Sequence, residues 1–275
     1  MTSPTSVTRN SEWIAREYGR EKWPAVLSRI EADLCAGETD LSRVVNRVKR
    51  WESGLAEEKE REFVVAGRAL RLPGPFALHG GVGWMAEKLL ALADGADAII
   101  ELGSGWGFNL FNLWLYGGPR GARYFALEYT EAGRSCTERL AALQPDLAIT
   151  TLPFDYHAVD LASLGRFSGR VFVYTCFSID QIPHLSAAVY LALRKLADRV
   201  DGMHFEPAGW QMDGERCVGS SHRYAEQHDY NRNLWSLLNQ LQEEGILRIE
   251  AHTPELFGQN PENSASMIYW TMDAS

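Results

Sequence analysis

AIIELGSGWGFN, residues 98–109, is the stretch that decides the fold of this 275-residue chain. Its first three residues are apolar, as in a strand that is covered on both faces of a sheet. Glu101 follows in this strand, and Gly103, Gly105 and Gly107 then occupy alternate positions. Glycines let the backbone turn sharply and approach a ligand without a Cβ in the way. Because the next residues are apolar enough for a helix packed on the sheet, the stretch predicts a loop that binds a nucleotide-type cofactor.

The spacing of these glycines separates the candidate cofactors. A dinucleotide-binding loop has glycines at its first, third and sixth positions, but the sixth position here is Phe108. The chain also lacks the Gly-Lys-Ser/Thr run of a triphosphate-binding loop. The acid-x-Gly-x-Gly-x-Gly pattern of residues 101–107 instead resembles the first motif of class I S-adenosylmethionine-dependent methyltransferases. The resemblance implies that Glu101 lies near the charged amino-acid end of that cofactor. It places the loop along the sugar and methionine portions, with contacts from Gly103, Ser104, Gly105, Gly107 and Asn109.

The next predicted strand, residues 123–128, ends in Glu128. An acid about 20–25 residues beyond the first glycine stands where a carboxylate can accept hydrogen bonds from ribose hydroxyls. In the methyltransferase family an acid at the end of the second strand has this role, so the resemblance implies that Glu128 binds the ribose. A solvated glutamate at a strand end is the alternative, and an NAD-binding fold would place an acid here equally well.

Strands and helices alternate along the rest of the chain, which is the pattern of a doubly wound parallel sheet. Further strands are expected at residues 147–152, 170–175, 200–205, 246–251 and 265–272, and helices at residues 81–93, 131–143, 184–197 and 225–244. The final strand pair matches the methyltransferase core, whose last strand runs antiparallel. We therefore expect an α/β, Rossmann-like, seven-stranded and mostly parallel sheet that forms a core domain over residues 81–275.

The first eighty residues match no motif that we can name. Residues 11–35 and 41–62 have apolar positions at helical intervals, and residues 61–72 have strand-forming residues on both sides of Ala66-Gly67, as in a hairpin. We expect residues 1–80 to form an N-terminal helical cap with a small hairpin. By analogy with small-molecule methyltransferases, such a segment would lie over the cofactor as a lid.

Composition restricts the location and the partners of the protein. The formal net charge of −9 disfavours nucleic acid, because binding it normally needs a basic surface. No apolar run approaches the ~20 residues of a membrane span, and the N-terminus lacks the apolar core of a signal peptide. The seven histidines show no metal-ligand spacing, and the scattered cysteines suggest reduced thiols: Cys35, Cys136, Cys176 and Cys217. We expect a cytoplasmic protein without a metal that acts on a small molecule, with a homodimer left open.

The third and fourth strands end in candidates for both ligands, because ligands of such a sheet lie beyond the carboxyl ends of its strands. After the third strand, the resemblance places Asp155 beside the adenine amino group, with Tyr156 available to stack on the ring; a turn aspartate is the alternative. After the fourth, Thr175 begins a region that lines cofactor and substrate in the family. Asp180 and His184 are candidate bases or substrate anchors there, against a helix cap and a surface histidine as the alternatives.

The fifth strand ends in Glu206, the best candidate for a catalytic or substrate-binding acid, because a carboxylate in a cleft is costly to leave unpaired. His204 in the same strand is a further catalytic candidate, and Trp210 is a candidate wall of the pocket. Three polar residues at the start of the long helix share its inward side and need partners, which a substrate or a structural network would supply: Gln227, Tyr230 and Asn231.

Together these patterns predict transfer of a methyl group from S-adenosylmethionine to a small-molecule metabolite. The acids and the many aromatic residues suggest an amine, amino-acid or guanidine nitrogen as the acceptor, in specialised biosynthesis. Methylation of oxygen or carbon in an aromatic metabolite is the alternative within this class. An NAD-dependent oxidoreductase would share the fold, and a non-catalytic binding protein would share the core. The sequence does not identify the acceptor.

Overall fold

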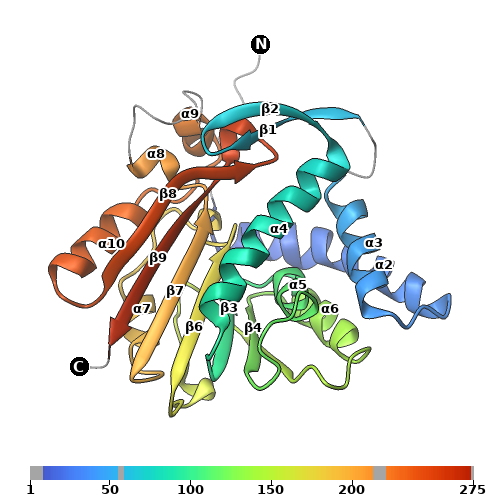
Figure 1. Cartoon of the computed structure of the whole chain (residues 1–275), viewed down its shortest axis with the longest axis horizontal. Coiled ribbons are helices and arrows are strands. Elements are labelled where there is room, and N and C mark those ends of the chain that lie inside the picture. The colour runs from blue at the N-terminus through green and yellow to red at the C-terminus, as the bar shows by residue number, and fades with distance from the viewer. Residues whose placement is uncertain (1–8, 55–58, 213–220, 274–275) are drawn as a thin grey trace.

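A nine-stranded sheet forms the centre of the molecule (Figure 1). The computed structural model describes residues 9–54, 59–212 and 221–273. Within these residues the strands are ordered β2-β1-β8-β9-β7-β6-β3-β4-β5 across the sheet. The strands are β1 (Glu60–Val65), β2 (Arg68–Pro73), β3 (Ala98–Leu102), β4 (Arg123–Glu128), β5 (Ile149–Pro153), β6 (Arg170–Cys176), β7 (Arg199–Glu206), β8 (Arg248–Gly258) and β9 (Ala265–Asp273).

One half of the sheet is parallel, as predicted. Strands β7, β6, β3, β4 and β5 run in the same direction. Strand β9 lies between β7 and β8 and is antiparallel to both, which confirms the predicted orientation of the last strand. All five residues of β3 are buried, as expected of an apolar strand in the middle of a parallel sheet. The carboxyl ends of the parallel strands therefore meet at one edge, where Glu101, Glu128 and Glu206 lie.

The hairpin β1–β2 extends this sheet, which therefore has nine strands and not the predicted seven. Its turn is the predicted one, with Ala66 and Gly67 at φ of 48° and 73°. Val64 of β1 pairs with Gly258 of β8. This pairing exists because β8 continues to Gly258 instead of ending at residue 251. The hairpin thus belongs to the sheet as well as to the segment before the core.

Helices cover both faces of the sheet, so the fold is doubly wound. Ile99 of β3 packs in a core with the helices on one face, whereas Ile100 packs in a second core on the other face. The first face carries α2 (Trp23–Cys35), α3 (Leu41–Glu52), α4 (Gly74–Ala93), α5 (Phe108–Leu115) and α6 (Glu131–Ala141). The second carries α7 (Ala188–Leu193) and α10 (Leu234–Glu243). Shorter helical segments are α8 (Gly209–Met212), α9 (Ser221–Gln227), η2 (Ala162–Leu164), η3 (Ile179–Gln181) and η4 (Pro261–Asn263).

The chain before the hairpin is helical, as predicted. Helix α1 (Ser11–Arg16), the π-helical η1 (Glu17–Lys22) and α2 follow one another without a break. Helix α2 contacts α6, so this segment lies beside the parallel half of the sheet. Helix α3 ends at Glu52, before residue 62 where we expected its end. Helix α4 begins at Gly74 rather than at residue 81, so it passes through the expected boundary at residue 80 and joins the two parts.

The predicted helix over residues 225–244 is two helices, α9 and α10, with a loop between them. Asp229 in this loop has a φ of 53°, outside the helical region. The Oδ1 atom of Asn231 accepts hydrogen bonds from the backbone N–H groups of Asn233 and Leu234, at 3.0 and 2.8 Å, and these begin α10. The leucine periodicity continues across residues whose polar side chains interrupt the helix.

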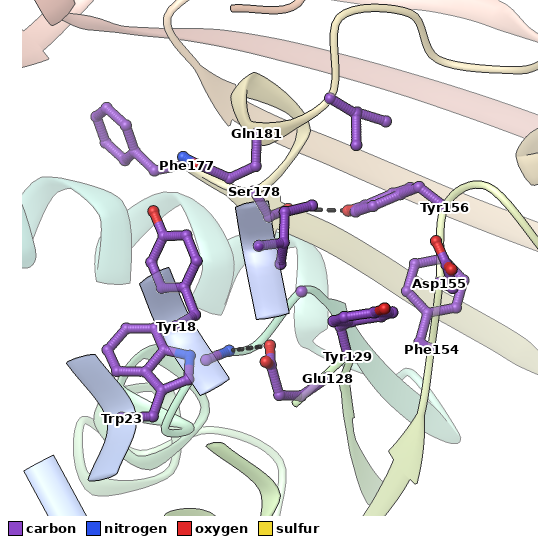
Figure 2. A pocket seen from close by; sticks show the side chains of 14 residues that line it. Tyr18, Trp23, Glu128, Tyr129, Phe154, Asp155, Tyr156, Phe177, Ser178 and Gln181 are labelled. Atoms are coloured by element: carbon purple, nitrogen blue, oxygen red, sulfur yellow. Dashed lines mark hydrogen bonds between the residues drawn. The ribbon is translucent and has the colours of Figure 1, made fainter. Parts of the chain in front are cut away.

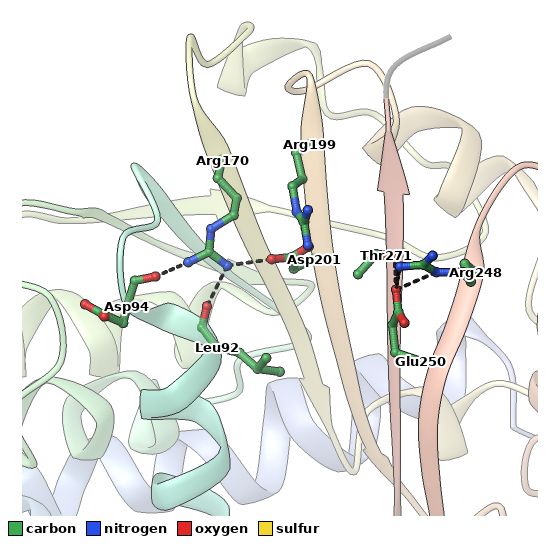
Figure 3. A network of polar contacts seen from close by, with 8 residues as sticks. All are labelled: Leu92, Asp94, Arg170, Arg199, Asp201, Arg248, Glu250 and Thr271. Atoms are coloured by element: carbon green, nitrogen blue, oxygen red, sulfur yellow. Dashed lines mark hydrogen bonds and ion pairs between the residues drawn. The ribbon is translucent and has the colours of Figure 1, made fainter.

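The amino-terminal ends of the parallel strands are joined by ion pairs around one buried aspartate (Figure 3). Asp201 of β7 is buried and accepts hydrogen bonds from Arg170 at 2.5 Å and from Arg199 at 2.9 Å. Arg170 also donates to the carbonyl oxygens of Leu92, at 2.8 Å, and of Asp94. The cluster ties the end of α4 to β6 and β7, at the edge of the sheet opposite the glycine loop.

Two expectations from composition concern the whole chain. Among the helices of the described residues, none combines the length and the apolar character that a membrane crossing needs. Cys35, Cys136 and Cys176 are free thiols. Cys217, the fourth cysteine, lies outside the described residues.

Candidate functional site

The glycine loop between β3 and α5 has the predicted strand–loop–helix course. Gly103 and Gly105 have φ of 70° and 55°, which side chains rarely adopt. A Cβ on Gly103 would lie 2.5 Å from the Cβ of Ser178, and one on Gly105 would lie 2.8 Å from the ring of Trp23. The glycines therefore let the loop backbone approach the loop after β6 and the N-terminal helices. Ser104 adds a buried hydroxyl that has no hydrogen-bond partner among the described residues.

A first cavity of about 560 Å³ lies beside this loop. Figure 2 shows Tyr18 and Trp23 on one side of it, residues 154–156 on the other and Glu128 between them. The N-terminal helices, the end of β4 and the segment after β5 thus enclose one space. The remaining lining residues are Ile14, Gly103, Gly105, Tyr129, Phe177, Ser178, Gln181 and Ile182.

Glu128 lies in the wall of this first cavity and is almost fully buried. Its Oε2 accepts a hydrogen bond from the N–H of Gly105 at 3.0 Å. Its Oε1 accepts from the backbone N–H and the hydroxyl of Thr130, at 2.9 and 2.7 Å. Burial raises the pKa of Glu128. The carboxylate therefore ties the glycine loop to β4, and Oε2, with one donor, keeps capacity for another.

Asp155 and Tyr156 both line the first cavity, as the sequence predicts. Oδ1 of Asp155 accepts a hydrogen bond from the N–H of His157 at 2.8 Å. The hydroxyl of Tyr156 donates to the carbonyl of Leu102 at 3.2 Å and lies 2.8 Å from the hydroxyl oxygen of Ser178. These bonds link Tyr156, which follows β5, to the end of β3 and to the loop after β6.

A second cavity of about 1400 Å³ opens on the other side of the glycine loop. It shares six lining residues with the first cavity: Tyr18, Trp23, Gly103, Gly105, Phe177 and Gln181. Its remaining walls include the predicted residues Glu101, Ser104, Asn109, Asp180 and Tyr230. Helices α3 and α4 and the chain around η4 supply further walls, with Lys49, Met85 and Asn263 among them. The two cavities therefore meet at the loop.

Glu101 is a fully buried acid in the wall of the second cavity. It accepts hydrogen bonds from the side-chain amide of Asn109 at 2.7 Å and from the hydroxyl of Tyr174 at 3.2 Å. Burial raises the pKa of Glu101 to about 8. Both of its partners are neutral, so a cation in the cavity would stabilise the ionised carboxylate.

Asp180, also buried, faces the second cavity from η3. Its Oδ1 accepts a hydrogen bond from the amide of Gln181 at 2.8 Å, and Gln181 in turn accepts one from Arg9. Burial raises the pKa of Asp180, and the nearby guanidinium of Arg9 opposes that rise. Burial and the charge of Asp180 together raise the pKa of the neighbouring hydroxyls of Tyr18 and Tyr230. Asp180 is thus a buried acid among hydroxyl groups at the edge of the cavity.

Glu206 lines neither of the two large cavities. Its carboxylate accepts hydrogen bonds from the backbone N–H groups of Ser178, at 3.1 Å, and of Asp180, at 3.3 Å. Burial and the neighbouring Asp180 raise the pKa of Glu206 to about 8. It touches a small space of about 170 Å³ beside α10. The geometry therefore makes Glu206 an anchor of the loop that presents Asp180, rather than a group facing the cavity as expected.

His204 and Thr175 lie in the core and not in either large cavity. Nε2 of His204 accepts a hydrogen bond from the indole of Trp270 at 2.8 Å, and the hydroxyl of Tyr190 lies 2.9 Å from the same atom. Nδ1 must then carry the proton, and it lies 2.9 Å from the hydroxyl oxygen of Thr175. Burial lowers the pKa of His204 to about 3. The expected catalytic role of His204 is not supported, because both ring nitrogens are occupied in the core.

The remaining predicted site residues also differ in whether they line a large cavity. His184 and Gln227 are exposed and line neither large cavity. Asn231 accepts a hydrogen bond from the N–H of Leu234 at the start of α10 and donates to the carbonyl of Ile182 at 3.1 Å. Trp210 stacks on His222 at a centroid distance of 4.8 Å, beside a separate space of about 210 Å³. Of the four predicted substrate-binding residues, the structure therefore brings only Tyr230 to the second cavity.

Sequence reasoning missed the part of the site that comes from the first 52 residues. Tyr18 and Trp23 wall both cavities, and Lys22, Lys49 and Glu52 wall the second. The helical periodicity of residues 11–35 marks Tyr18 as a core position, because a cavity wall and a core give the same pattern. The density of aromatic and charged residues before α2 is the signal that could have identified this wall.

No protein-family model matches the sequence, and no curated protein matches it. Several solved structures are similar. The geranyl diphosphate C-methyltransferase from Streptomyces coelicolor A3(2), in complex with Mg2+, geranyl diphosphate and S-adenosyl-L-homocysteine, is 12% identical, with 72% of this chain and 81% of that chain covered and a TM-score of 0.49. The magnesium protoporphyrin IX methyltransferase ChlM from Synechocystis PCC 6803, with bound S-adenosylhomocysteine, is 13% identical, with 72% and 84% covered and a TM-score of 0.45. The N-terminal domain of EvdMO1, with S-adenosylhomocysteine bound, is 14% identical, with 72% and 84% covered and a TM-score of 0.44. At these values the likeness concerns the course of the chain and not the residues of the site.

Proposed function

We propose that this chain transfers a methyl group from S-adenosylmethionine to a small molecule. The observation that carries the proposal is the meeting of two cavities at the glycine loop, one walled by Glu128 and Asp155, the other by Glu101 and Asp180. The first has the mixed polar and aromatic walls that suit an adenosine. The second offers buried acids to the charged end of the cofactor and to an acceptor.

The chain's own residues fit this cofactor at three points. Gly103 borders both cavities with its backbone, and a Cβ there would collide with Ser178. Ser104 holds a buried hydroxyl without a partner in the described part of the chain. Glu101 presents a buried carboxyl group whose present partners are both neutral. Each feature would be satisfied by a ligand that carries hydroxyl groups and a positive charge.

The residues have separate parts in the proposed reaction. When bound, S-adenosylmethionine would supply a methyl carbon on a positively charged sulfur, which a nucleophile can attack in line. Glu128 would accept hydrogen bonds from the ribose, Asp155 and Tyr156 would border the adenine, and Glu101 would hold the α-ammonium group. Tyr18 and Trp23 would keep water from the junction of the cavities, where donor and acceptor must align.

We infer that the accepting atom is a nitrogen of an amine, amino acid or guanidine. Asp180 supports this inference, since a buried carboxylate beside a cavity attracts a cationic group. The raised pKa of Asp180 also suits it to take up the proton that such a nitrogen loses. Tyr18 and Tyr230 would hold the acceptor beside it with their rings and hydroxyl groups.

We also propose that residues 1–80 act as a lid on a core of residues 81–275. Ile14, Tyr18 and Trp23 of the N-terminal helices wall the first cavity, which supports this division. Arg9 fastens the start of the segment to the core. Its backbone N–H donates to Asp229 at 2.9 Å and its Nε donates to the carbonyl of His228 at 2.6 Å.

Calorimetric titration with S-adenosylhomocysteine tests the donor half of the proposal. We expect saturable binding, with NAD giving none under the same conditions. Saturable NAD binding without a response to S-adenosylhomocysteine would replace the proposal with an oxidoreductase. Transfer of a labelled methyl group to a panel of amines and guanidines then tests the acceptor, with phenols and nucleic acid as comparison substrates. Methylation of phenols alone would keep the donor and replace the nitrogen acceptor.

A further inference from the structure

Two lysines and one glutamate form a charged cluster on the wall of the second cavity. Lys49 Nζ lies 2.7 Å from one carboxylate oxygen of Glu52, and Lys22 Nζ lies 3.5 Å from the other. Lys22 comes from η1 and the other two from α3, and all three line the cavity. The two ammonium groups hold the pKa of Glu52 below its usual value although the side chain is buried.

The cluster has more positive charge than its carboxylate neutralises. Two ammonium groups against one carboxylate leave one net positive charge beside the cavity. Aromatic rings position both lysines, with Lys49 Nζ 4.7 Å from the ring centre of Phe108 and Lys22 Nζ 5.0 Å from that of Trp23. An ammonium has three donors, so each lysine keeps N–H groups for a further acceptor. One lysine would suffice to pair Glu52 and join η1 to α3.

The same cavity holds the carboxyl group of Glu101, which is negative once it ionises, and the unpartnered hydroxyl of Ser104. A free α-amino acid group carries an ammonium and a carboxylate on one carbon, so its recognition requires an acid and a base around a single space. The ammonium of Lys49 lies over the ring of Phe108. Phe108 precedes Asn109, which donates a hydrogen bond to Glu101, so Lys49 can serve as the base in this recognition. The walls of the second cavity therefore match an amino-acid head group in charge.

We propose that the cluster of Lys22, Lys49 and Glu52 binds the carboxylate of the methionine part of the cofactor, while Glu101 binds its ammonium group. This inference rests on the proposed function, because it concerns one end of S-adenosylmethionine. Lys49 is the principal donor, and Lys22 adds charge and holds Glu52. The N-terminal segment would then contribute directly to cofactor affinity, in addition to covering the cavity.

Two ligands that differ only in the carboxylate test this assignment. S-Adenosylhomocysteine carries the carboxylate, and 5′-deoxy-5′-(3-aminopropylthio)adenosine has the same atoms without it. Calorimetry should show that Lys49→Met weakens binding of the first ligand by about 10- to 100-fold, the loss expected for one charged hydrogen-bond partner. The same substitution should change binding of the second ligand by less than about twofold. Lys22→Met should give a smaller loss with the same selectivity.

Lys88→Met is the matched control, because Lys88 also pairs with a glutamate, at 3.2 Å, has the same 42% exposure as Lys22 and lies outside the cavity. It should bind both ligands as the unaltered chain does. Lys49→Arg, which keeps the charge, should restore most of the affinity if Lys49→Met fails to fold. Equal weakening of both ligands, or of neither, would overturn the carboxylate assignment and leave the methyltransferase proposal intact. Failure of the unaltered chain to bind S-adenosylhomocysteine would overturn both.

Discussion

Buried carboxyl groups at the two ends of the parallel strands differ in their partners, which are charged at one end and neutral at the other. At the amino-terminal ends, Asp201 is paired with Arg170 and Arg199, and the cluster fastens α4 to the sheet. At the carboxyl ends, Glu101 has only neutral partners and faces an open cavity. A buried acid that is fully paired is part of the fold, which loses stability when one partner is removed, whereas an acid left without a cation retains capacity for a ligand. The difference between the ends therefore locates the site independently of any motif.

Glu206 shows that position at a carboxyl end is not sufficient for a place in the site. It is as buried as Glu101, and burial raises the pKa of each to about 8. Its oxygens, however, accept from the backbone N–H groups of the loop after β6. The comparison between the two ends therefore depends on what each carboxylate faces.

The largest effect is expected at the glycine loop. Gly103→Ala places a Cβ 2.5 Å from Ser178 at a φ of +70°, so the loop must move. We expect binding of S-adenosylhomocysteine to weaken by more than about 100-fold, because strain and overpacking each cost about 1–3 kcal/mol. Gly165→Ala is the control, since Gly165 has a φ of +68° near the amino-terminal end of β6 and nothing within 4 Å of its Cβ position. Isothermal calorimetry should show no loss of S-adenosylhomocysteine affinity for Gly165→Ala. A similar loss in both variants would contradict a specific role of the glycine loop in binding.

The next prediction compares the two ends of the strands: a substitution at one end should lower ligand affinity, and one at the other end should lower the free energy of unfolding. Glu101→Gln should weaken S-adenosylhomocysteine binding by about 1.5–3 kcal/mol, the value of a charged hydrogen bond, with little change in melting temperature. Asp201→Asn should leave binding unchanged and lower the free energy of unfolding by about 1–3 kcal/mol, since Arg170 loses its charged partner. Calorimetry and urea denaturation measure the two quantities. Lower stability with unchanged affinity in Glu101→Gln, and lower affinity in Asp201→Asn, would contradict the interpretation of Glu101 as a ligand-binding acid.

A smaller effect is expected from pH. Burial raises the pKa of Glu101 to about 8 from a usual 4.5, so the folded state binds the proton more tightly than the unfolded state does. The contribution of Glu101 to the free energy of unfolding is therefore fully present below about pH 4.5 and is lost as the pH rises through 8. A ligand ammonium favours the ionised carboxylate, so binding at pH 7 should release close to one proton, and affinity should rise between pH 6 and 8.

Calorimetry in two buffers of different ionisation enthalpy measures this proton release. Glu101→Gln should abolish it, whereas Glu206→Gln should retain it, because Glu206 faces neither large cavity. Release of no proton by the unaltered chain would show that Glu101 does not meet the ammonium group.

The smallest effect is expected at His184. Its side chain is exposed and lies outside both large cavities, although it follows the strand end that carries Asp180. His184→Ala should change S-adenosylhomocysteine affinity and melting temperature by no more than experimental error, as is usual for surface substitutions. A tenfold loss of affinity would mean that the loop after β6 closes onto the ligand in a conformation different from this one.

Much of the fold is predictable because it rests on local patterns. The apolar run of β3 and the turn at Ala66-Gly67 follow from residue types and spacing, whereas the antiparallel last strand was implied by the resemblance to the methyltransferase core. The continuation of β8 to Gly258 and the break between α9 and α10 were missed. The first depends on pairing with a distant hairpin. The second depends on the hydrogen bond from the N–H of Leu234 to the side chain of Asn231, which the leucine periodicity does not reveal.

The candidate site was predictable where it borders the glycine loop and less so elsewhere. Glu101, Glu128 and Asp155 lie in the cavity walls because strand order brings the ends of β3, β4 and β5 together. His204 has the same kind of sequence signal, but its ring faces Trp270 and Tyr190 in the core. An acid or histidine near a strand end can face the cleft or the protein interior, and spacing alone does not decide between them.

By itself, the sequence determined the glycine loop, the parallel strands around it and the acids at their ends, because apolar runs, glycine spacing and residue types at strand ends are local patterns in the chain. The tertiary structure decided which acids are free to meet a ligand and which are held by the protein. It also brought Tyr18, Trp23 and Lys49 to the cavities from helices that precede the core. Such walls arise from packing between distant segments, and no local pattern records which segments will meet.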